Sequence, residues 1–468
     1  MSYLRIKKHY VQVSYLILGV VEAFLAAGAS FAVVEILKHY QGLIINSTQY
    51  VSVIVISLLV LGCSSLAMGI YKALAREDFG SVILRSFVSY FLLASPILYV
   101  INILTANIFA GSKVIFGIVI LSTLLVIMAR WIFLKLVDTE QVKRRVLLYG
   151  AGFRAKKLID ELLPHINAGG VELVGCVSSA NEPVVVHQLP ILSEPQEWLE
   201  YVRKNMITEI VIVPDDRRRS GSGEFPFEQL LDCKMAGVVS SEALEFSERE
   251  LGFVDLSVLR PAWLLFSDGF KYAPINIFGK RLTDLVLSVV GVILLWPVMV
   301  LTAIAVKLDS KGPVIYSQLR IGLGGKVFRI YKFRSMTVDA EKDGAVWASK
   351  GDARVTRVGS FIRNTRLDEL PQLYNIFCGD MSFVGPRPER PEFVDKLKKL
   401  IPYYDLRHKV KPGLVGWAQL NYPYGWSEAD AKNKLQYDLY YVKNRSFFMD
   451  FLILIQTVEV ILLGKGAQ

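Results

Sequence analysis

The chain has 468 residues, of which 53% are hydrophobic and 21% charged, and its net charge is +10. This length allows two to four domains, and so apolar a composition is typical of a membrane protein. A basic protein can bind nucleic acid, but no basic surface interleaved with aromatic residues is evident, so we expect anionic lipid and phosphorylated substrates as partners, and no nucleic acid. The four cysteines are far apart and include no Cys-x-x-Cys pair, so we expect reduced thiols and no cysteine metal site.

Residues 1–137 contain four long apolar runs, at 11–37, 50–71, 82–104 and 114–136. Each is long enough to cross a bilayer at roughly 20 residues per span, so we predict a four-helix transmembrane bundle. Basic residues precede the first run, lie between the second and third, and follow the fourth, which predicts that both ends of the bundle are cytoplasmic. The apolar character continues past the candidate cleavage site Ala27-Gly-Ala29, so we expect the first run to be retained rather than removed as a signal peptide.

Two acidic residues are prominent in these runs. Glu35 lies near the end of the first run, whereas Glu22 lies inside it and is either a helix-contact residue or part of a relay. One such residue does not justify a transport function.

Residues 138–270 alternate between strand-like and helix-like segments and predict a Rossmann-like accessory α/β domain. Strands are expected at 145–149, 171–177 and 209–213, and a helix at 153–163. Gly150-x-Gly152-x-x-Ala155 follows the first strand and matches the permissive form of the dinucleotide-binding turn. The acidic residue expected after the second strand is missing, because Ser178-Ser-Ala180 stands there. The turn is therefore either a nucleotide site or, at least as readily, a tight connection between strand and helix.

Residues 271–311 contain a fifth apolar run, from Leu285 to Val306, which is long enough for another span. Pro297 lies in its middle, where it removes a backbone donor and clashes with the preceding turn, so we expect a sharp break at Trp296-Pro297. Both ends of the run are basic, which favours the same side of the membrane for both. We therefore predict a re-entrant membrane helix rather than a straight span.

Residues 312–468 begin with a predicted β-hairpin. Its second strand, Val327–Phe333, follows the turn Gly322-Leu-Gly-Gly325. Lys332 and Arg334 alternate with Phe333, which puts both cations on one face of that strand.

An acidic pair, Asp368 and Glu369, stands out in the segment that follows. Leucines recur around it at helical spacing and Thr365 precedes Asp368 by three residues, so we expect the pair in the first turn of a helix. Acidic residues in a first turn are usually simple caps. Here they accompany several cations, one of which, Arg387, is fixed in the rigid turn Gly385-Pro-Arg-Pro388. That set suits a carboxylate nucleophile beside a divalent cation and a phosphate.

These residues carry a family resemblance over the last two fifths of the chain. From about residue 280 the sequence resembles the bacterial polyprenyl-phosphate hexose-1-phosphate transferases, the monotopic phosphoglycosyl transferases. The matching stretches are Lys280-Arg-Leu-Thr-Asp284, Gly312-Pro-Val-Ile-Tyr-Ser-Gln318, Arg320-Ile-Gly322, Tyr331-Lys-Phe-Arg-Ser-Met336, Leu367-Asp-Glu-Leu-Pro-Gln-Leu373, Gly379-Asp-Met-Ser382, Gly385-Pro-Arg-Pro388 and Lys411-Pro-Gly-Leu-Val-Gly-Trp417.

The resemblance implies a mostly helical monotopic catalytic domain that transfers hexose-1-phosphate from a UDP-hexose to undecaprenyl phosphate and releases UMP. It implies Mg²⁺ as cofactor, Asp368 as the nucleophile that forms a phosphosugar intermediate, and Glu369 as a residue that helps to hold the metal. The expected location is the bacterial inner membrane with the catalytic part facing the cytoplasm, the expected hexose is glucose or galactose, and a homodimer is expected. The candidate substrate-binding residues are Lys332, Arg334, Arg363, Arg366, Asp380 and Arg387, of which Asp380 either caps a turn or ligates metal.

One alternative function belongs to a different enzyme class. Transmembrane helices followed by a glycine turn also suit a membrane-anchored NAD-dependent nucleotide-sugar dehydratase or epimerase. Such an enzyme needs a Tyr-x-x-x-Lys pair, and the pair at Tyr3 and Lys7 precedes the first apolar run.

Overall fold

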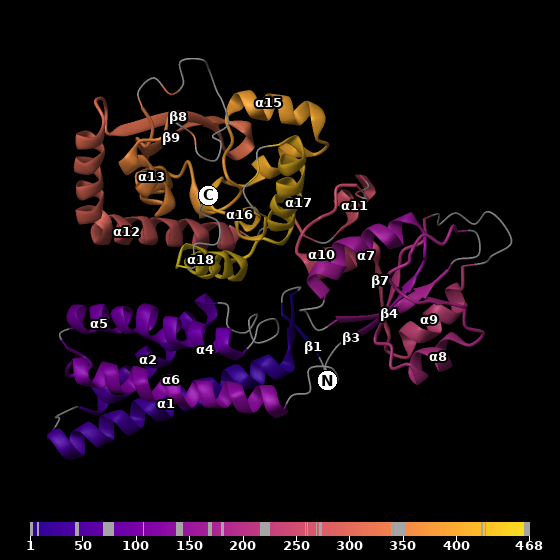
Figure 1. The fold of residues 1–468 in the computed structure, drawn as a ribbon, viewed down its shortest axis with the longest axis horizontal. Helices are drawn as coiled ribbons and strands as arrows, with labels where there is room; N and C mark the ends of the chain where they lie inside the picture. Colours follow the sequence, from indigo (N-terminus) through magenta and orange to yellow (C-terminus); the bar gives the residue numbers. More distant parts are fainter. Residues whose placement is uncertain are drawn as a thin grey trace. The chain divides into compact units, whose positions relative to one another are not determined.

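The structure, a computed structural model, describes residues 3–462 except 7–8, 43–45, 69–78, 106, 137–143, 167–170, 179–181, 216–224, 258, 260, 268, 271–273, 338–339, 341–351, 353, 423–424 and 426. Its contacts divide the chain into two compact units, Met1–Gly252 and Phe253–Gln468 (Figure 1). The first unit holds the N-terminal helices and the α/β module. The second holds the fifth apolar helix and the acidic pair.

The four predicted apolar runs form long helices. A short antiparallel hairpin of β1 (Tyr3–Ile6) and β2 (His9–Gln12) leads into the first of them. Three of the four runs are single helices, whereas the third is divided by a π-helical turn, at the end of which Ser95-Pro96 begins a new helix. The elements are α1 (Val13–Gln41), α2 (Ser47–Ala67), α4 (Phe79–Phe87), η1 (Val88–Ala94), α5 (Ser95–Leu104) and α6 (Ser112–Leu136).

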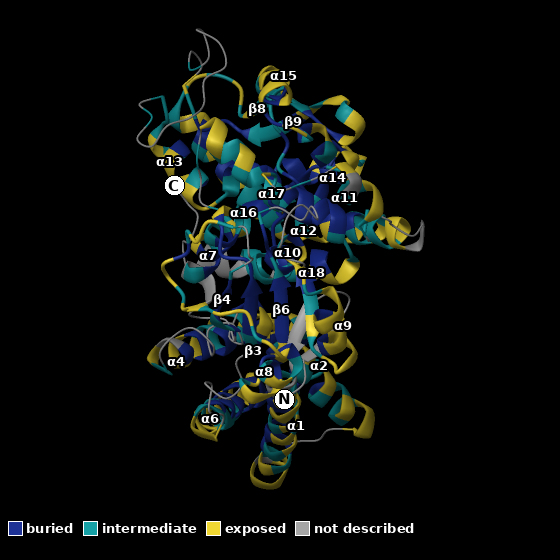
Figure 2. Ribbon diagram, turned by 90° about the vertical axis from the view of Figure 1, so that its right-hand side faces the viewer, coloured by how far each residue is buried: buried dark blue, intermediate teal, exposed yellow. Residues whose placement is uncertain are grey.

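These helices pack against one another through one apolar cluster that includes Val34, Leu61, Leu98 and Ile118. Their other faces leave large apolar side chains exposed, such as Phe24, which is 75% exposed. Figure 2 shows these exposed residues along α1 and α6. Helices that are apolar on the outside as well as the inside suit a lipid environment.

The polar exception among these helices is a buried ion pair. Glu22 of α1 accepts two hydrogen bonds from Arg130 of α6, at 2.7 and 2.9 Å, and both side chains are buried. Glu22 is therefore a helix-contact residue, one of the two roles considered for it. Its partner was missed, because Arg130 lies inside an otherwise apolar run.

The α/β module contains a parallel five-stranded sheet with strand order β5-β4-β3-β6-β7. Numbered from β3 as the first strand, this is order 3-2-1-4-5, the arrangement of doubly wound nucleotide-binding folds. All three predicted strands and the predicted helix are present. The strands are β3 (Arg144–Tyr149), β4 (Val171–Val177), β5 (Ile191–Leu192), β6 (Glu209–Ile212) and β7 (Val239–Glu242), with helices α7 (Phe153–Ile166), α8 (Trp198–Lys204), α9 (Phe227–Met235) and α10 (Ala243–Leu251).

Both faces of this sheet are covered, because successive strand residues point to opposite sides. Val146 and Leu148 of β3 pack with α7 and α10, whereas Leu147 and Tyr149 pack with α8 and α9. Figure 2 accordingly shows β4 and β6 as largely buried. Ala155, the last residue of the glycine-turn pattern, is buried in the α7 side of this core.

The second unit begins before the fifth apolar run. Val254, Leu256 and Trp263 pack against its core, although the sequence pattern predicts residues 253–270 to be the end of the α/β module. The core also takes in Val394, Leu439 and Ile453. The helices of this unit are α11 (Pro261–Phe266), α12 (Pro274–Asp309), α13 (Arg357–Asn364), α14 (Gln372–Cys378), α15 (Pro391–Leu400), α16 (Trp417–Asn421), α17 (Glu428–Asn444) and α18 (Phe447–Leu462), with 3₁₀ turns η2 (Leu323–Gly325), η3 (Leu367–Glu369) and η4 (Tyr404–Lys409).

Two short sheets connect these helices. The predicted hairpin is confirmed: β8 (Ile315–Ile321) pairs antiparallel with β9 (Val327–Phe333), with Tyr316 opposite Lys332. A second pair, β10 (Ser382–Val384) and β11 (Gly413–Val415), is parallel.

The fifth apolar run lies in α12, which is helical from Pro274 to Asp309 with Pro297 inside it. Figure 1 shows this helix as two arms that meet at a corner. We call residues 274–296 the first arm and residues 298–309 the second arm. Among the described residues α12 is one of five helices long and apolar enough to cross a membrane, and only 11% of its apolar window is buried.

Candidate active site

Three segments of the second unit meet at Glu369. Lys332 at the end of β9 donates a hydrogen bond to Glu369 Oε1 at 2.9 Å, and Arg387 donates one to the same oxygen at 2.6 Å. Asp368 and Glu369 are both only 7% exposed. The sequence-predicted pair and two of its predicted cations are therefore brought together, with the carboxylates buried and the cations partly exposed.

The two carboxylates differ in their electrostatic surroundings. Burial alone would raise the pKa of Glu369, but Arg387 and Lys332 outweigh it and hold that pKa well below its usual range. Burial raises the pKa of Asp368, and the neighbouring charge of Glu369 adds to this effect, while Lys332, Arg387 and Arg363 oppose it only in part. Neighbouring acids whose pKa values are pushed apart are suited to different tasks.

The backbone that carries the two acidic residues differs from the predicted helix. Asp368 and Glu369 lie in the 3₁₀ turn η3, and α14 begins only at Gln372. The predicted cap was wrong, because Thr365 ends α13 and its hydroxyl donates to Phe361 O at 2.8 Å. Arg366 between the two elements has a left-handed backbone (φ 59°), which breaks the helix and turns the pair toward β9.

Two further predicted arginines contribute charge to the site. Arg363 lowers the pKa of Asp368 and is held by a 2.8 Å hydrogen bond from its Nε to Ser335 Oγ. Arg366 contributes to the low pKa of Glu369.

The remaining two predicted residues have contacts elsewhere. Arg334 donates to the carbonyl of Ser310 at 2.7 Å and to its hydroxyl at 2.9 Å, so it holds the end of α12. Asp380 is exposed after α14, where its amide donates to Asn375 O at 3.0 Å and its Oδ2 accepts from Asn375 Nδ2 at 3.5 Å, so the turn-capping and metal-ligand roles considered for it both stay predictions.

Other residues that support the site had not been singled out. Arg407 donates to the backbone carbonyl of Arg387 at 2.8 Å and pairs with Asp438 at 2.9 Å, so a buried ion pair holds the segment that carries Arg387. Asn375 accepts from the amide of Tyr331 and donates to Arg329 O, which ties α14 to β9. These partners lie far apart in sequence, so no local pattern would have found them.

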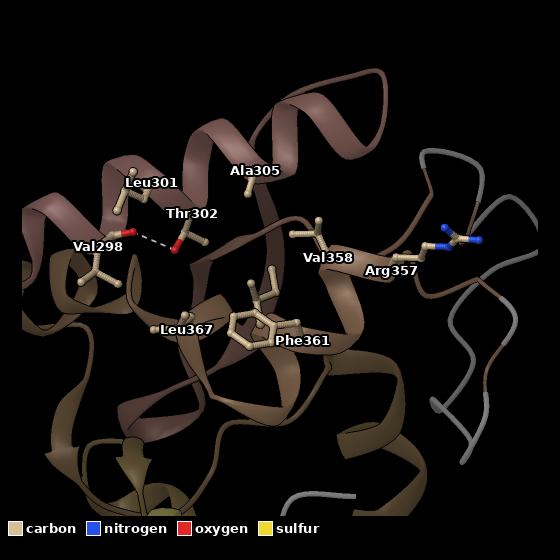
Figure 3. A pocket seen from close by; sticks show the side chains of 9 residues that line it. Val298, Leu301, Thr302, Ala305, Arg357, Val358, Phe361 and Leu367 are labelled. Atoms are coloured by element: carbon tan, nitrogen blue, oxygen red, sulfur yellow. Dashed lines mark hydrogen bonds between the residues drawn. The ribbon is translucent and has the colours of Figure 1, made fainter.

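An apolar cavity of about 480 Å³ lies beside the acidic pair. It is bounded by the second arm of α12 and by α13, and Leu367, the residue before Asp368, forms part of its wall (Figure 3). Thr302 does not make this wall polar, because its hydroxyl donates to Val298 O of its own helix at 2.8 Å. The lining residues are Val298, Leu301, Thr302, Ala305, Arg357, Val358, Phe361, Ile362 and Leu367.

The acidic pair provides hard oxygen donors for a divalent cation, but not a complete cage. Within the described ranges no group of three or more His, Cys, Asp or Glu side chains is placed to hold a metal. Mg²⁺ is commonly bound by one or two carboxylates, with water and substrate phosphate completing its shell. Asp368 accepts no hydrogen bond from the described residues, so its oxygens suit that role.

The fold and site define a membrane-associated protein whose C-terminal unit carries an acidic pair among cations. The sequence profile described as bacterial sugar transferase matches residues 275–464, which include α12 and the whole site. A putative undecaprenyl-phosphate N-acetylgalactosaminyl 1-phosphate transferase of Bacillus subtilis is 52% identical over 128 residues, which are 72% of that protein and 27% of this chain. The chain belongs to the bacterial sugar transferase family.

Two longer relatives match over a smaller share of their own length. The UDP-N-acetylgalactosamine-undecaprenyl-phosphate N-acetylgalactosaminephosphotransferase of Aeromonas hydrophila is 42% identical over 257 residues, 55% of this chain and 60% of that protein. The UDP-glucose:undecaprenyl-phosphate glucose-1-phosphate transferase of Klebsiella pneumoniae is 46% identical over 198 residues, 41% of this chain and 42% of that protein. The matches thus cover less than two thirds of these relatives.

Proposed function

We propose that this protein transfers a sugar-1-phosphate from a UDP-sugar to undecaprenyl phosphate and releases UMP, as the first membrane step of exopolysaccharide or O-antigen synthesis. The observation that carries the proposal is the buried Asp368–Glu369 pair, with Glu369 bridged by Lys332 and Arg387. Family membership and the activities for which the relatives are named agree with it.

The reaction proceeds in two displacements at one phosphorus atom. A carboxylate oxygen of Asp368 attacks the sugar-bearing phosphorus of the donor, and the bond from that phosphorus to the bridging oxygen breaks, so UMP leaves with the oxygen. A phosphate oxygen of undecaprenyl phosphate then attacks the same phosphorus and releases Asp368. The product is an undecaprenyl diphosphate sugar, and the enzyme returns to its starting state.

The charges around Asp368 and Glu369 suit the two carboxylates to different roles. Glu369, whose pKa is held low by two cations, remains an anion that positions Lys332 and Arg387 for the phosphates. Asp368, whose pKa is raised, is the more basic carboxylate and therefore the better nucleophile. When bound, Mg²⁺ would be held by Asp368 and Glu369 and would offset the negative charge of the diphosphate.

The contacts of α12 support a re-entrant helix with a break at Trp296-Pro297. Near the beginning of the first arm, Lys280 pairs with Asp450 of α18 at 2.7 Å, and Asp284 accepts a 3.0 Å hydrogen bond from Ser382 of β10. At the end of the second arm, Arg334 of the catalytic fold binds Ser310. A straight helix of this length would extend about 50 Å at 1.5 Å per residue, which would separate these ends across a bilayer.

The apolar cavity suits the lipid substrate. An isoprenoid chain is purely hydrocarbon, and the wall formed by the second arm and α13 is apolar up to Leu367, the residue before the nucleophile. We therefore place the first isoprene units of undecaprenyl phosphate in this cavity. The N-terminal helices then form a four-helix transmembrane bundle in the bacterial inner membrane, with the catalytic unit on the cytoplasmic side.

The test uses purified protein and a UDP-sugar labelled with ³²P at the sugar-bearing phosphate. Wild type should release UMP and retain protein-bound label, whereas Asp368→Asn should do neither. Asp395→Asn is the matched control, because Asp395 is exposed on α15. Label retained by Asp368→Asn, or UMP release by it at the wild-type rate, would refute the proposed nucleophile.

The donor sugar and the oligomeric state need separate measurements. The relatives named above act on UDP-N-acetylgalactosamine and on UDP-glucose, so a donor screen by UMP release should include both, together with UDP-galactose. A homodimer is expected, and the mass of the protein in lipid nanodiscs checks it.

A further inference from the structure

The glycine turn of the α/β module has the shape of a dinucleotide-binding turn. Gly150 follows β3 with φ +124°, and a Cβ there would lie 2.8 Å from the backbone carbonyl of Val213. β3 lies between β4 and β6, and the strand order reverses between β3 and β6. In this fold ligands bind in the crevice at such a switch point. The turn and its position are therefore those of a nucleotide site.

The place of a phosphate in this turn is taken by a side chain. Asp215, which follows β6, accepts hydrogen bonds from the amides of Phe153 at 2.9 Å and Arg154 at 2.8 Å, one to each carboxylate oxygen. These are the first amides of α7, the groups that bind the pyrophosphate of a dinucleotide in such folds. The carboxylate of Asp215 thus satisfies the helix end as a bound phosphate would.

A second carboxylate closes the crevice from the other side. Glu182, in the loop after β4, accepts from the amides of Ala151 at 3.1 Å and Asp215 at 2.9 Å. This is the loop in which an acidic residue normally binds a ribose. An acidic residue does not stand directly after β4, but Glu182 follows a few positions later and is turned inward. A Cβ on Gly152 would collide with carboxylate oxygens of both Glu182 and Asp215, so the space kept open by this glycine is already filled.

We propose that the α/β module closes its own nucleotide crevice, with Asp215 as a built-in substitute for the phosphate and Glu182 as a brace between the loops. The two carboxylates repel a pyrophosphate by charge and exclude it by volume. The module therefore binds neither NAD nor another dinucleotide, and its role is structural. This inference is independent of the transferase activity and removes the basis for an NAD-dependent function.

The test is hydrogen exchange of the peptide covering residues 150–158 in the full-length protein in nanodiscs, with NADH and inorganic pyrophosphate as probes. In wild type the peptide should be protected, and neither probe should change its exchange. In Asp215→Ala the first amides of α7 lose their acceptor and should exchange about tenfold faster, and pyrophosphate should restore protection because it occupies the vacated place. Asp232→Ala, an exposed change on α9, should behave as wild type.

Three results would overturn the proposal. NADH or pyrophosphate could increase protection of this peptide in wild type, the peptide could exchange equally in Asp215→Ala and wild type, or the variant could fail to respond to pyrophosphate. The wild-type measurement decides even if Asp215→Ala does not fold. Because exchange is read at this peptide alone, binding of pyrophosphate to the catalytic unit does not affect the result.

Discussion

Arg387 and Lys332 share one oxygen of Glu369, but their side chains are not equivalent. Arg387 lies in a turn fixed by prolines on both sides, and its backbone carbonyl is held by Arg407. A guanidinium presents several donors in a fixed plane, whereas an ammonium is a point charge on a flexible stem. Arg387 is therefore the residue that we propose to hold a phosphate group through the reaction.

We predict that Arg387→Lys lowers kcat by roughly 10²-fold, because the charge remains but the planar donors at the transferring phosphate are lost. Steady-state UMP release measures this. The matched control is Lys326→Arg, a cation change at the end of the η2 turn of the β8–β9 hairpin, which should leave kcat unchanged. An Arg387→Lys enzyme with wild-type kcat would remove this residue from the site.

His408 gives the catalytic unit a defined sensitivity to acid. Burial, assisted by Arg407, lowers the pKa of His408 to about 4 from a usual value of 6.5. The folded state therefore disfavours the protonated ring, and the stability that the neutral ring provides is lost as the pH falls from 6.5 to 4. The full effect is on the order of 3 kcal/mol, since each pKa unit corresponds to about 1.4 kcal/mol.

We predict that His408→Gln flattens the decline of melting temperature between pH 6.5 and 4. His187→Gln, an exposed position in the α/β module, is the control and should follow wild type. Asp438 also titrates in this window, with a pKa raised to about 6 by burial, but it is present in all three proteins. An unchanged pH profile in His408→Gln would show that the ring is already protonated in the fold.

At the residue scale, sequence reasoning found the groups but not their arrangement. Asp368, Glu369 and Arg387 stand in local motifs that can be read from the chain. The opposite pKa shifts of the two acids depend on burial and on Lys332, which lies 36 positions before Asp368, so they required the fold. Glu182 was overlooked because its partners, Ala151 and Asp215, come from other loops.

At the scale of the elements, one buried polar cluster joins the N-terminal helices to one another. Arg130 of α6 is fully buried and binds Glu22 of α1 through two nitrogens, and it also donates to Ser86 of α4 and Ser65 of α2. Four helices thus meet at one guanidinium. In a lipid environment, where apolar contacts discriminate little between helix pairs, such a cluster fixes which faces meet.

Replacing only one residue of the Glu22–Arg130 pair should reduce the stability of the protein more than replacing both. Glu22→Leu or Arg130→Leu leaves a buried charge unpaired, which typically costs on the order of 3–5 kcal/mol, whereas the double variant leaves none. We predict a large fall in melting temperature in detergent for each single variant and recovery of most of it in the double variant. Glu35→Gln, at an exposed pair with Lys38, should change little. Additive losses in the double variant would contradict a coupled pair.

For α12 the prediction concerns the position of its ends. Phe278 in the first arm and Leu308 in the second are 67% and 82% exposed, so cysteines at these positions should be accessible to reagent. In inside-out vesicles, with Cys63 and Cys378 replaced, both should react with a membrane-impermeant maleimide if the helix is re-entrant. If one of the two cysteines reacted only when the reagent was on the periplasmic side, α12 would span the membrane.

Element type was largely predictable and element geometry was not. Apolar length and period identified the four long N-terminal runs, the strands of the module and the hairpin before the acidic pair. The π-turn at Val88–Ala94 and the 3₁₀ turn at Leu367–Glu369 were not predicted, because each departs from helical geometry by only one hydrogen-bond step. Pro297 predicted a bend in α12. The residues that bind the two ends of this helix could be identified only from the folded chain.

On the scale of the whole molecule, the proposed reaction must join a water-soluble donor to a lipid acceptor. The second unit carries features that suit both proposed substrates: cations and an acidic pair for the diphosphate, and beside them an apolar cavity lined in part by the second arm of α12. The proposed covalent intermediate on Asp368 would let the two substrates react one after the other at the same place.

The most direct test of this account is the mass of the enzyme during turnover. Protein quenched after mixing with UDP-sugar, without undecaprenyl phosphate, should gain the mass of one sugar phosphate, and fragmentation should place it on Asp368. Asp368→Asn should gain none, and added undecaprenyl phosphate should remove the adduct from wild type. UMP release by wild type with no adduct under these conditions, or an adduct on a different residue, would contradict the account.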